Sequence, residues 1–178
     1  MPTYVAFLRA INLGAKRKFP KDAIKAASVA AGGTDVETYI NTGNVRLTHP
    51  ARSVAKVQQA LEEAYAAAAG FDVPTVVFTT KDLAALTARA EELHAEHDPA
   101  GQHYVTLYAA APPAAAVEAA HALEHDGEVV VVDGRAAYVL LEGNIHTSRL
   151  LASKELAALG QGTARTVKVL RTVTEKWC

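Results

Sequence analysis

The chain has 178 residues, of which 50% are hydrophobic and 21% charged. This composition is typical of one ordinary or two small globular domains and excludes a disordered chain. The formal net charge of -1 argues against a large basic surface for nucleic acid. The single cysteine is Cys178, which excludes an internal disulfide. Because the N-terminus has no signal-peptide pattern, we expect a cytoplasmic protein.

One apolar stretch, residues 104–123, is long enough for a membrane span. It is mostly alanine, is interrupted by Pro112 and Pro113, and carries Glu118 and His121. Such residues are rare in the middle of a spanning helix, so we expect no membrane contact.

The first part of the chain predicts the order strand, helix, strand, strand, helix, strand. β-Branched and aromatic runs predict the strands, a Gly or a turn sequence ends most elements, and Ser53 is a plausible helix N-cap. The expected elements are a strand at 3–8, a helix at 21–31, a hairpin at 36–49 that turns at 41–44, a helix at 53–69 and a strand at 73–80.

After a connector helix at 80–97, the same order recurs. The further expected elements are a strand at 103–110, a helix at 112–125, a hairpin at 128–142 that turns at Asp133-Gly134, a helix from Ser148 to 160 and a final segment from Thr163. Two copies of a βαββαβ unit indicate an internal duplication.

This order predicts an α+β fold of two ferredoxin-like halves, each a four-stranded antiparallel sheet of strand order 4132 with both helices on one face. We predict an N-terminal half at 1–79, a connector helix and loop at 80–100 and a C-terminal half at 101–178. In the first half, this topology brings the end of the first strand beside the start of the third.

A basic loop follows the first strand. The segment LRAINLGAKRKF, residues 8–19, holds four basic residues and no acidic one, and the topology brings it to the Asn-Thr-Gly-Asn turn. Arginine forks and backbone amides bind oxyanions, and lysines add charge. We therefore predict a site for a small anionic ligand, a nucleotide or phosphorylated metabolite. Its predicted residues are Arg9, Asn12, Gly14, Lys16, Lys18, Asn41, Thr42, Gly43 and Asn44.

The same stretches resemble a known family. Residues 8–19 are similar to the LRxINxGG segment, and TYINTGNVRL at 38–47 to the TYxxSGN segment, of the bacterial family known as domain of unknown function 1697. Ala15 stands for the second glycine and Thr42 for the serine. Near the C-terminus the family's TxRNWxT segment is only partly kept, either at Thr163 and Arg165 or in a second candidate register that begins at Arg171. The resemblance implies the duplicated ferredoxin-like fold along the chain but no activity, since the family has none assigned.

Other chemistries have weaker support. RNA binding on the sheet would need exposed aromatic residues on the first and third strands, but Tyr4 and Phe7 alternate between faces and the third strand has none. A divalent metal could use the polar cluster at 92–103 or the pair His121 and His125, although neither has a complete metal motif. The alternative, purely structural interpretation of the basic loop is a solvated turn whose asparagines form hydrogen bonds with backbone groups.

No catalytic motif is recognisable, so enzymatic activity stays open and no cofactor or metal is expected. The alternative function is a noncatalytic protein-interaction or RNA-binding module. Strands that are apolar on both faces need cover on the second face, which the other half, the connector helix or a second copy in a homodimer could provide.

Overall fold

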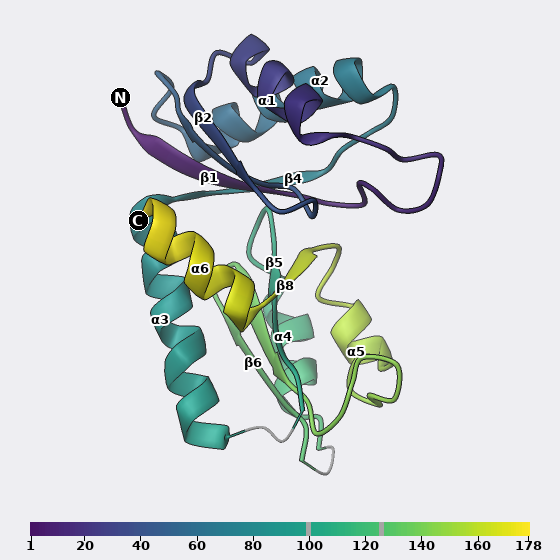
Figure 1. Cartoon of the computed structure of the whole chain (residues 1–178). Coiled ribbons are helices and arrows are strands. Elements are labelled where there is room, and N and C mark those ends of the chain that lie inside the picture. Colours follow the sequence, from purple (N-terminus) through teal and green to yellow (C-terminus); the bar gives the residue numbers. More distant parts are fainter. Residues whose placement is uncertain (99–100, 125–126) are drawn as a thin grey trace. The chain divides into compact units, whose positions relative to one another are not determined.

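The computed structural model describes residues 1–98, 101–124 and 127–178. It contains two four-stranded antiparallel sheets of the same topology, ordered β2-β3-β1-β4 and β6-β7-β5-β8 (Figure 1). The strands are β1 Thr3–Leu8, β2 Thr34–Tyr39, β3 Asn44–Thr48, β4 Thr75–Thr79, β5 His103–Leu107, β6 Val129–Asp133, β7 Ala136–Leu140 and β8 Thr163–Thr166. The helices are α1 Lys21–Ala30, α2 Val54–Ala69, α3 Thr80–His97, α4 Ala114–His121, α5 Lys154–Ala157 and α6 Val167–Trp177.

In the first sheet, α1 and α2 lie on the same face (Figure 1). Alternation along β1 sends Tyr4, Ala6 and Leu8 into the core beneath these helices. The helix α2 starts because Ser53 accepts a hydrogen bond from the backbone N–H of Lys56. A single apolar core thus fixes the orientation of both helices on the sheet.

The opposite face of this sheet is also apolar. Val5, Phe7 and Phe78 are buried, and the rings of Phe7 and Phe78 pack edge to face at 6.4 Å. At β2, the indole N–H of Trp177 donates to the Glu37 carboxylate at 3.1 Å. The C-terminal end of α6 therefore contacts the edge strand of the first sheet.

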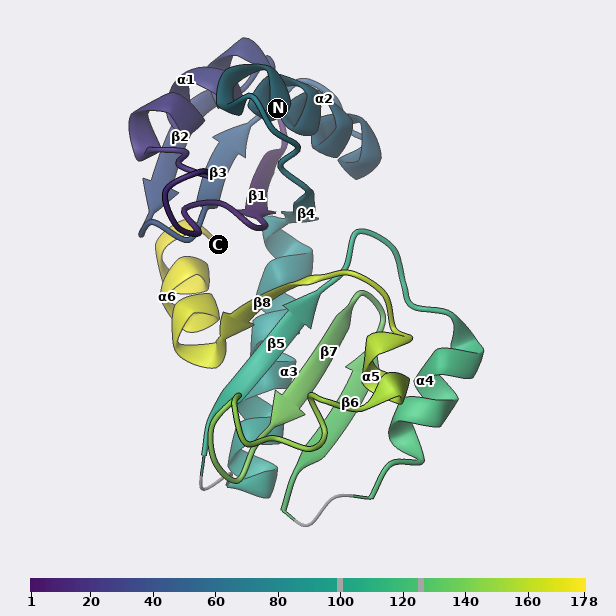
Figure 2. The ribbon, with the colours of Figure 1, turned by 90° about the vertical axis from the view of Figure 1, so that its right-hand side faces the viewer.

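The second sheet has helices on both faces (Figure 2). The core beneath α4 and α5 includes Ala120 and Val139. On the other face, Tyr138 donates its hydroxyl proton to the carbonyl of Leu86 in α3 at 3.3 Å. The connector helix, one of the covers expected for a second face, thus contacts the second sheet.

The predicted fold class is confirmed, and the strand order 4132 is present in both halves. Two elements near the C-terminus differ from the prediction. The helix expected from Ser148 begins only at Lys154, because the Ser153 hydroxyl accepts from Leu156 N–H and starts a new short helix there. The final segment contains a helix, α6, as well as the predicted strand.

The chain forms two compact units, one of residues 1–84 and 173–178 and one of residues 85–172. The unit boundaries fall within α3 and α6. The domain limits expected after residues 79 and 100 stay predictions.

No helix in the described ranges has both the length and the apolar character needed to cross a membrane.

Candidate anion-binding site

The basic loop between β1 and α1 is joined to the β2–β3 turn by hydrogen bonds. The side-chain amide of Asn12 donates to the carbonyl of Asn41 at 2.8 Å, and the backbone N–H of Leu8 donates to the carbonyl of Gly43 at 2.8 Å. The loop and the turn therefore meet at one edge of the sheet.

Asn12 also closes the loop on itself. Its side-chain oxygen accepts from Phe19 N–H at 2.9 Å, and its backbone N–H donates to the Arg17 carbonyl at 2.6 Å. Both functional groups of the Asn12 amide thus shape the loop. This is the role that the purely structural interpretation gives to asparagines in turns.

Arg17 holds the loop from the other side. Its guanidinium donates to the carbonyls of Ala10 and Asp72, both at 2.8 Å, and lies 4.7 Å from the centre of the Phe71 ring. The α2–β4 connection therefore belongs to the same edge. Arg17 was not among the predicted site residues, because the sequence alone does not show which of four cations turns back to bind carbonyls.

The turn at residues 41–44 is packed tightly. Asn44 is fully buried, and its amide donates to the Tyr39 carbonyl at 3.0 Å and to the Thr42 hydroxyl at 3.1 Å. Gly43 has φ +78, and a Cβ there would lie 2.7 Å from that of Leu8. Asn41 and Thr42 are exposed.

The predicted cations lie around this frame. Lys16 and Lys18 are exposed, whereas Arg9 is half-buried, with its backbone N–H bound to the carbonyl of Pro74 at 2.9 Å. Gly14 has φ +64 and open space where a Cβ would lie. Across the described residues, no carboxylate lies within ion-pair distance of Lys16 or Lys18.

The backbone around the site adopts the left-handed region at three non-glycine residues, Ala10 with φ 56, Asn12 with φ 55 and Ile40 with φ 49. For a β-branched residue such as Ile40 this conformation is strongly disfavoured. Strain of this kind persists only where surrounding contacts fix the backbone, which agrees with the dense bonding of the loop and turn.

The alternative metal ligands do not converge. Within residues 1–98, 101–124 and 127–178 there is no group of three histidine, cysteine or acidic residues able to hold a metal. The His121 ring accepts a hydrogen bond from Val132 N–H at 2.8 Å, and His125 lies outside the described residues. His94 and His103 stack with ring centres 5.6 Å apart. The sequence analysis considered these two histidines only as candidate metal ligands, within the polar cluster at 92–103.

These features define an α+β protein of two ferredoxin-like halves with a basic loop closed over a tight turn. The chain belongs to the family described as protein of unknown function (DUF1697), whose model matches residues 1–138. It is also similar in fold to the conserved bacterial protein SP0830 from Streptococcus pneumoniae, with 22% identity, a TM-score of 0.74 and coverage of 99% of this chain and 98% of that one. No curated protein matches the chain.

Proposed function

We propose that the protein binds a small anionic ligand, such as a nucleotide or a phosphorylated metabolite, at the basic loop and the adjoining turn. One observation carries the proposal. Asn12 and Arg17 fix the loop through backbone carbonyls, and Lys16 and Lys18 stay exposed, with no carboxylate partner in the described part of the chain. A fixed loop with uncompensated charge favours anions, because little ordering is required on binding.

In this proposal the site residues divide into two groups. Arg9 supplies a planar fork for an oxyanion, Lys16 and Lys18 supply steering charge, and Gly14 lets the ligand approach the backbone. The exposed Thr42 hydroxyl is a further hydrogen-bonding group. The three asparagines and Gly43 hold the loop and turn in shape.

The test is a thermal-shift screen of nucleotides, sugar phosphates and simple anions on the wild type and on Arg9→Ala. We expect at least one compound to raise the melting temperature of the wild type and to have little effect on the variant. Arg9→Lys should bind about tenfold more weakly despite its charge, since the bidentate fork is lost. Lys25→Ala removes an exposed lysine of α1 and serves as the control.

If no compound stabilises the wild type and Arg9→Ala simply melts earlier, the loop is scaffolding and the proposal is wrong. Lys18→Ala should reduce the association rate mainly at low salt, because an exposed charge acts through long-range attraction.

We further infer that the equal topology of the two sheets reflects an internal duplication, and that the protein is cytoplasmic. Its partner is then the small ligand rather than nucleic acid. The alternative partner is a second copy of the chain in a homodimer. A monomer mass measured by light scattering at high concentration would exclude this alternative.

A further inference from the structure

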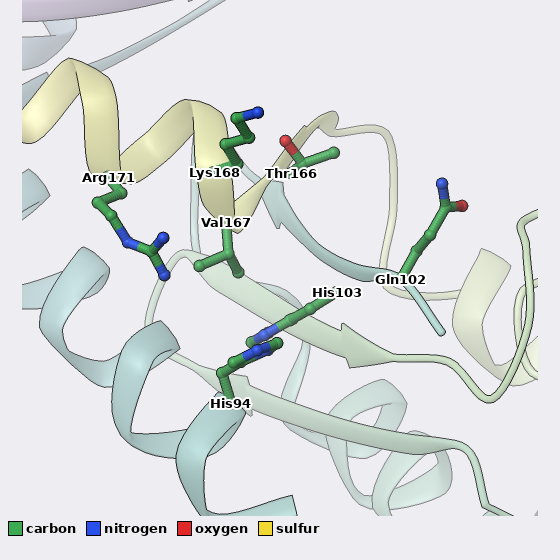
Figure 3. Close-up of a pocket in the computed structure, with 7 residues that line it drawn as sticks. All are labelled: His94, Gln102, His103, Thr166, Val167, Lys168 and Arg171. Carbon is green, nitrogen blue, oxygen red and sulfur yellow. The ribbon is translucent and has the colours of Figure 1, made fainter. Parts of the chain in front are cut away.

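A cavity of about 270 Å³ is formed entirely by residues of the 85–172 unit (Figure 3). Its walls come from α3, from the start of β5, and from the junction of β8 and α6. The lining residues are His94, Gln102, His103, Thr166, Val167, Lys168 and Arg171. The volume lies just below the usual range for ligand pockets, so it suits a small molecule.

The histidine pair is the unusual part of this wall. His103 is only 5% exposed, and neither of its ring nitrogens has a hydrogen-bond partner among the described residues. The same holds for Nδ1 of His94. The two rings are stacked with an angle of 7° between their planes, so they cannot satisfy one another. Buried polar groups are nearly always paired, so these unpaired nitrogens favour a polar ligand at this wall of the cavity.

The charge of the lining favours an anion. Lys168 and Arg171 are cationic, and among the described residues that line the cavity none is acidic. The Arg171 guanidinium already forms a two-point pair with Glu91, with both N–O distances 2.7 Å. Lys168 points away from the stacked rings (Figure 3), so it adds charge at the rim.

The start of α6 adds to this field. The Thr166 hydroxyl accepts a hydrogen bond from the backbone N–H of Val169 at 3.3 Å. The first turn of this 11-residue helix lies against the cavity, since Val167 and Lys168 line it. The partial positive charge of a helix N-terminus favours oxyanions.

We propose that this cavity binds a small oxyanion that also carries an acidic or hydroxyl proton, with hydrogenphosphate as the simplest example. Burial, and next the neighbouring His94, lowers the pKa of His103 to about 4, so its ring is neutral at pH 7. A neutral imidazole has one N–H donor and one acceptor nitrogen. Hydrogenphosphate can accept from an N–H of one of the two stacked rings and donate its P–OH proton to a bare nitrogen of the other, whereas sulfate has only acceptors.

The experiment is a titration of the full chain with inorganic phosphate and, separately, with sulfate at pH 7.5, followed by the imidazole ¹⁵N resonances of His103 and by calorimetry. We expect phosphate to move the His103 resonances and sulfate to bind about tenfold more weakly, because sulfate leaves one buried nitrogen unpaired. Lactate, an oxyanion with a hydroxyl, tests whether the hydroxyl proton is enough.

His103→Phe keeps a ring against His94 but removes both nitrogens, and it should lower phosphate affinity at least about tenfold. The matched control is His146→Phe, at an exposed histidine of the same unit that does not line the cavity. His103→Gln, which retains a donor and an acceptor, should keep part of the affinity. Since the His103 resonances report this cavity alone, the result is independent of the basic loop. Unmoved His103 resonances, or equal binding of sulfate and phosphate, would overturn the proposal.

Discussion

Gly43 is the residue at which the β2–β3 turn meets the end of β1. It has φ +78, and a Cβ at this position would lie 2.7 Å from Cβ of Leu8 and 2.8 Å from Cδ1 of Ile11. Both neighbours are buried and have little room to move. The turn therefore requires glycine for its backbone conformation and for space.

We predict that Gly43→Ala destabilises the protein more than Gly70→Ala does. Gly70 has φ +76, and nothing lies within 4 Å of a Cβ built there. Alanine at this position is therefore destabilised only by the left-handed backbone conformation, by about 1–2 kcal/mol. At Gly43 the overpacking adds about 1–3 kcal/mol. Urea unfolding followed by circular dichroism measures both. Equal losses would mean that the turn moves freely away from β1.

Arg17 and Asn12 show what the sequence could not predict at this scale. The density of basic residues predicted the loop between β1 and α1 as a site, and the predicted topology indicated that it meets the β2–β3 turn. Which cation remains exposed depends on carbonyl positions at Ala10 and Asp72, and these are set by backbone far apart in the chain. Lys16 and Lys18 lie beside Arg17 in sequence and are exposed.

Among the elements, the segment between β7 and α5 is held by one carboxylate. Oε2 of Glu128 accepts from the Ser148 hydroxyl at 3.1 Å and from the Leu150 backbone N–H at 3.0 Å. Leu150 is buried in the second core. These bonds fix a turn where the sequence predicted the start of a helix.

We predict that Glu128→Ala loosens this segment and lowers stability by at least about 1.5–3 kcal/mol, the contribution of one hydrogen bond to a charged acceptor, because it removes two such bonds. Hydrogen exchange of residues 148–153 should become faster. Glu128→Gln keeps one acceptor oxygen and should lose less. If the alanine variant leaves exchange in this segment unchanged, the carboxylate does not hold the turn.

Element boundaries were predicted well where a local signal marks them. Ser53 and Gly70 delimit α2, and the connector helix spans Thr80–His97. The helix α6 was missed although Val167, Leu170, Val173 and Trp177 have helical spacing and are all buried. Its many β-branched residues favour strands locally, and packing overrides that preference.

At the scale of the whole molecule, repetition of the same element order was the strongest signal. It predicted both sheets, including the adjacency of β1 and β3. The cavity at α6 could not be predicted in the same way. His94 belongs to α3 and His103 to β5, and their stacking follows from how these two elements pack.

From this packing we expect the stability of the molecule to depend on pH. After burial, the charges of His94, Glu91 and His97 influence the pKa of His103, and His94 also stacks on its ring. Lys168 and Arg171 line the same cavity. The pKa of the Glu91 carboxyl is itself lowered, first by its hydrogen bonds from Arg171.

We predict that His103→Phe flattens the loss of stability on acidification. The pKa of His103 falls from 6.5 to about 4 on folding, so between these pH values the unfolded chain binds a proton that the folded chain does not. The contribution of His103 to the free energy of unfolding is therefore fully present above pH 6.5 and declines as pH falls toward 4. The slope from this residue is at most about 1.4 kcal/mol per pH unit. Urea unfolding at a series of pH values, followed by circular dichroism, measures the slope. His146→Phe, an exposed control, should keep the wild-type slope. If wild type and His103→Phe lose stability in parallel across this range, His103 is not the group that couples folding to protonation.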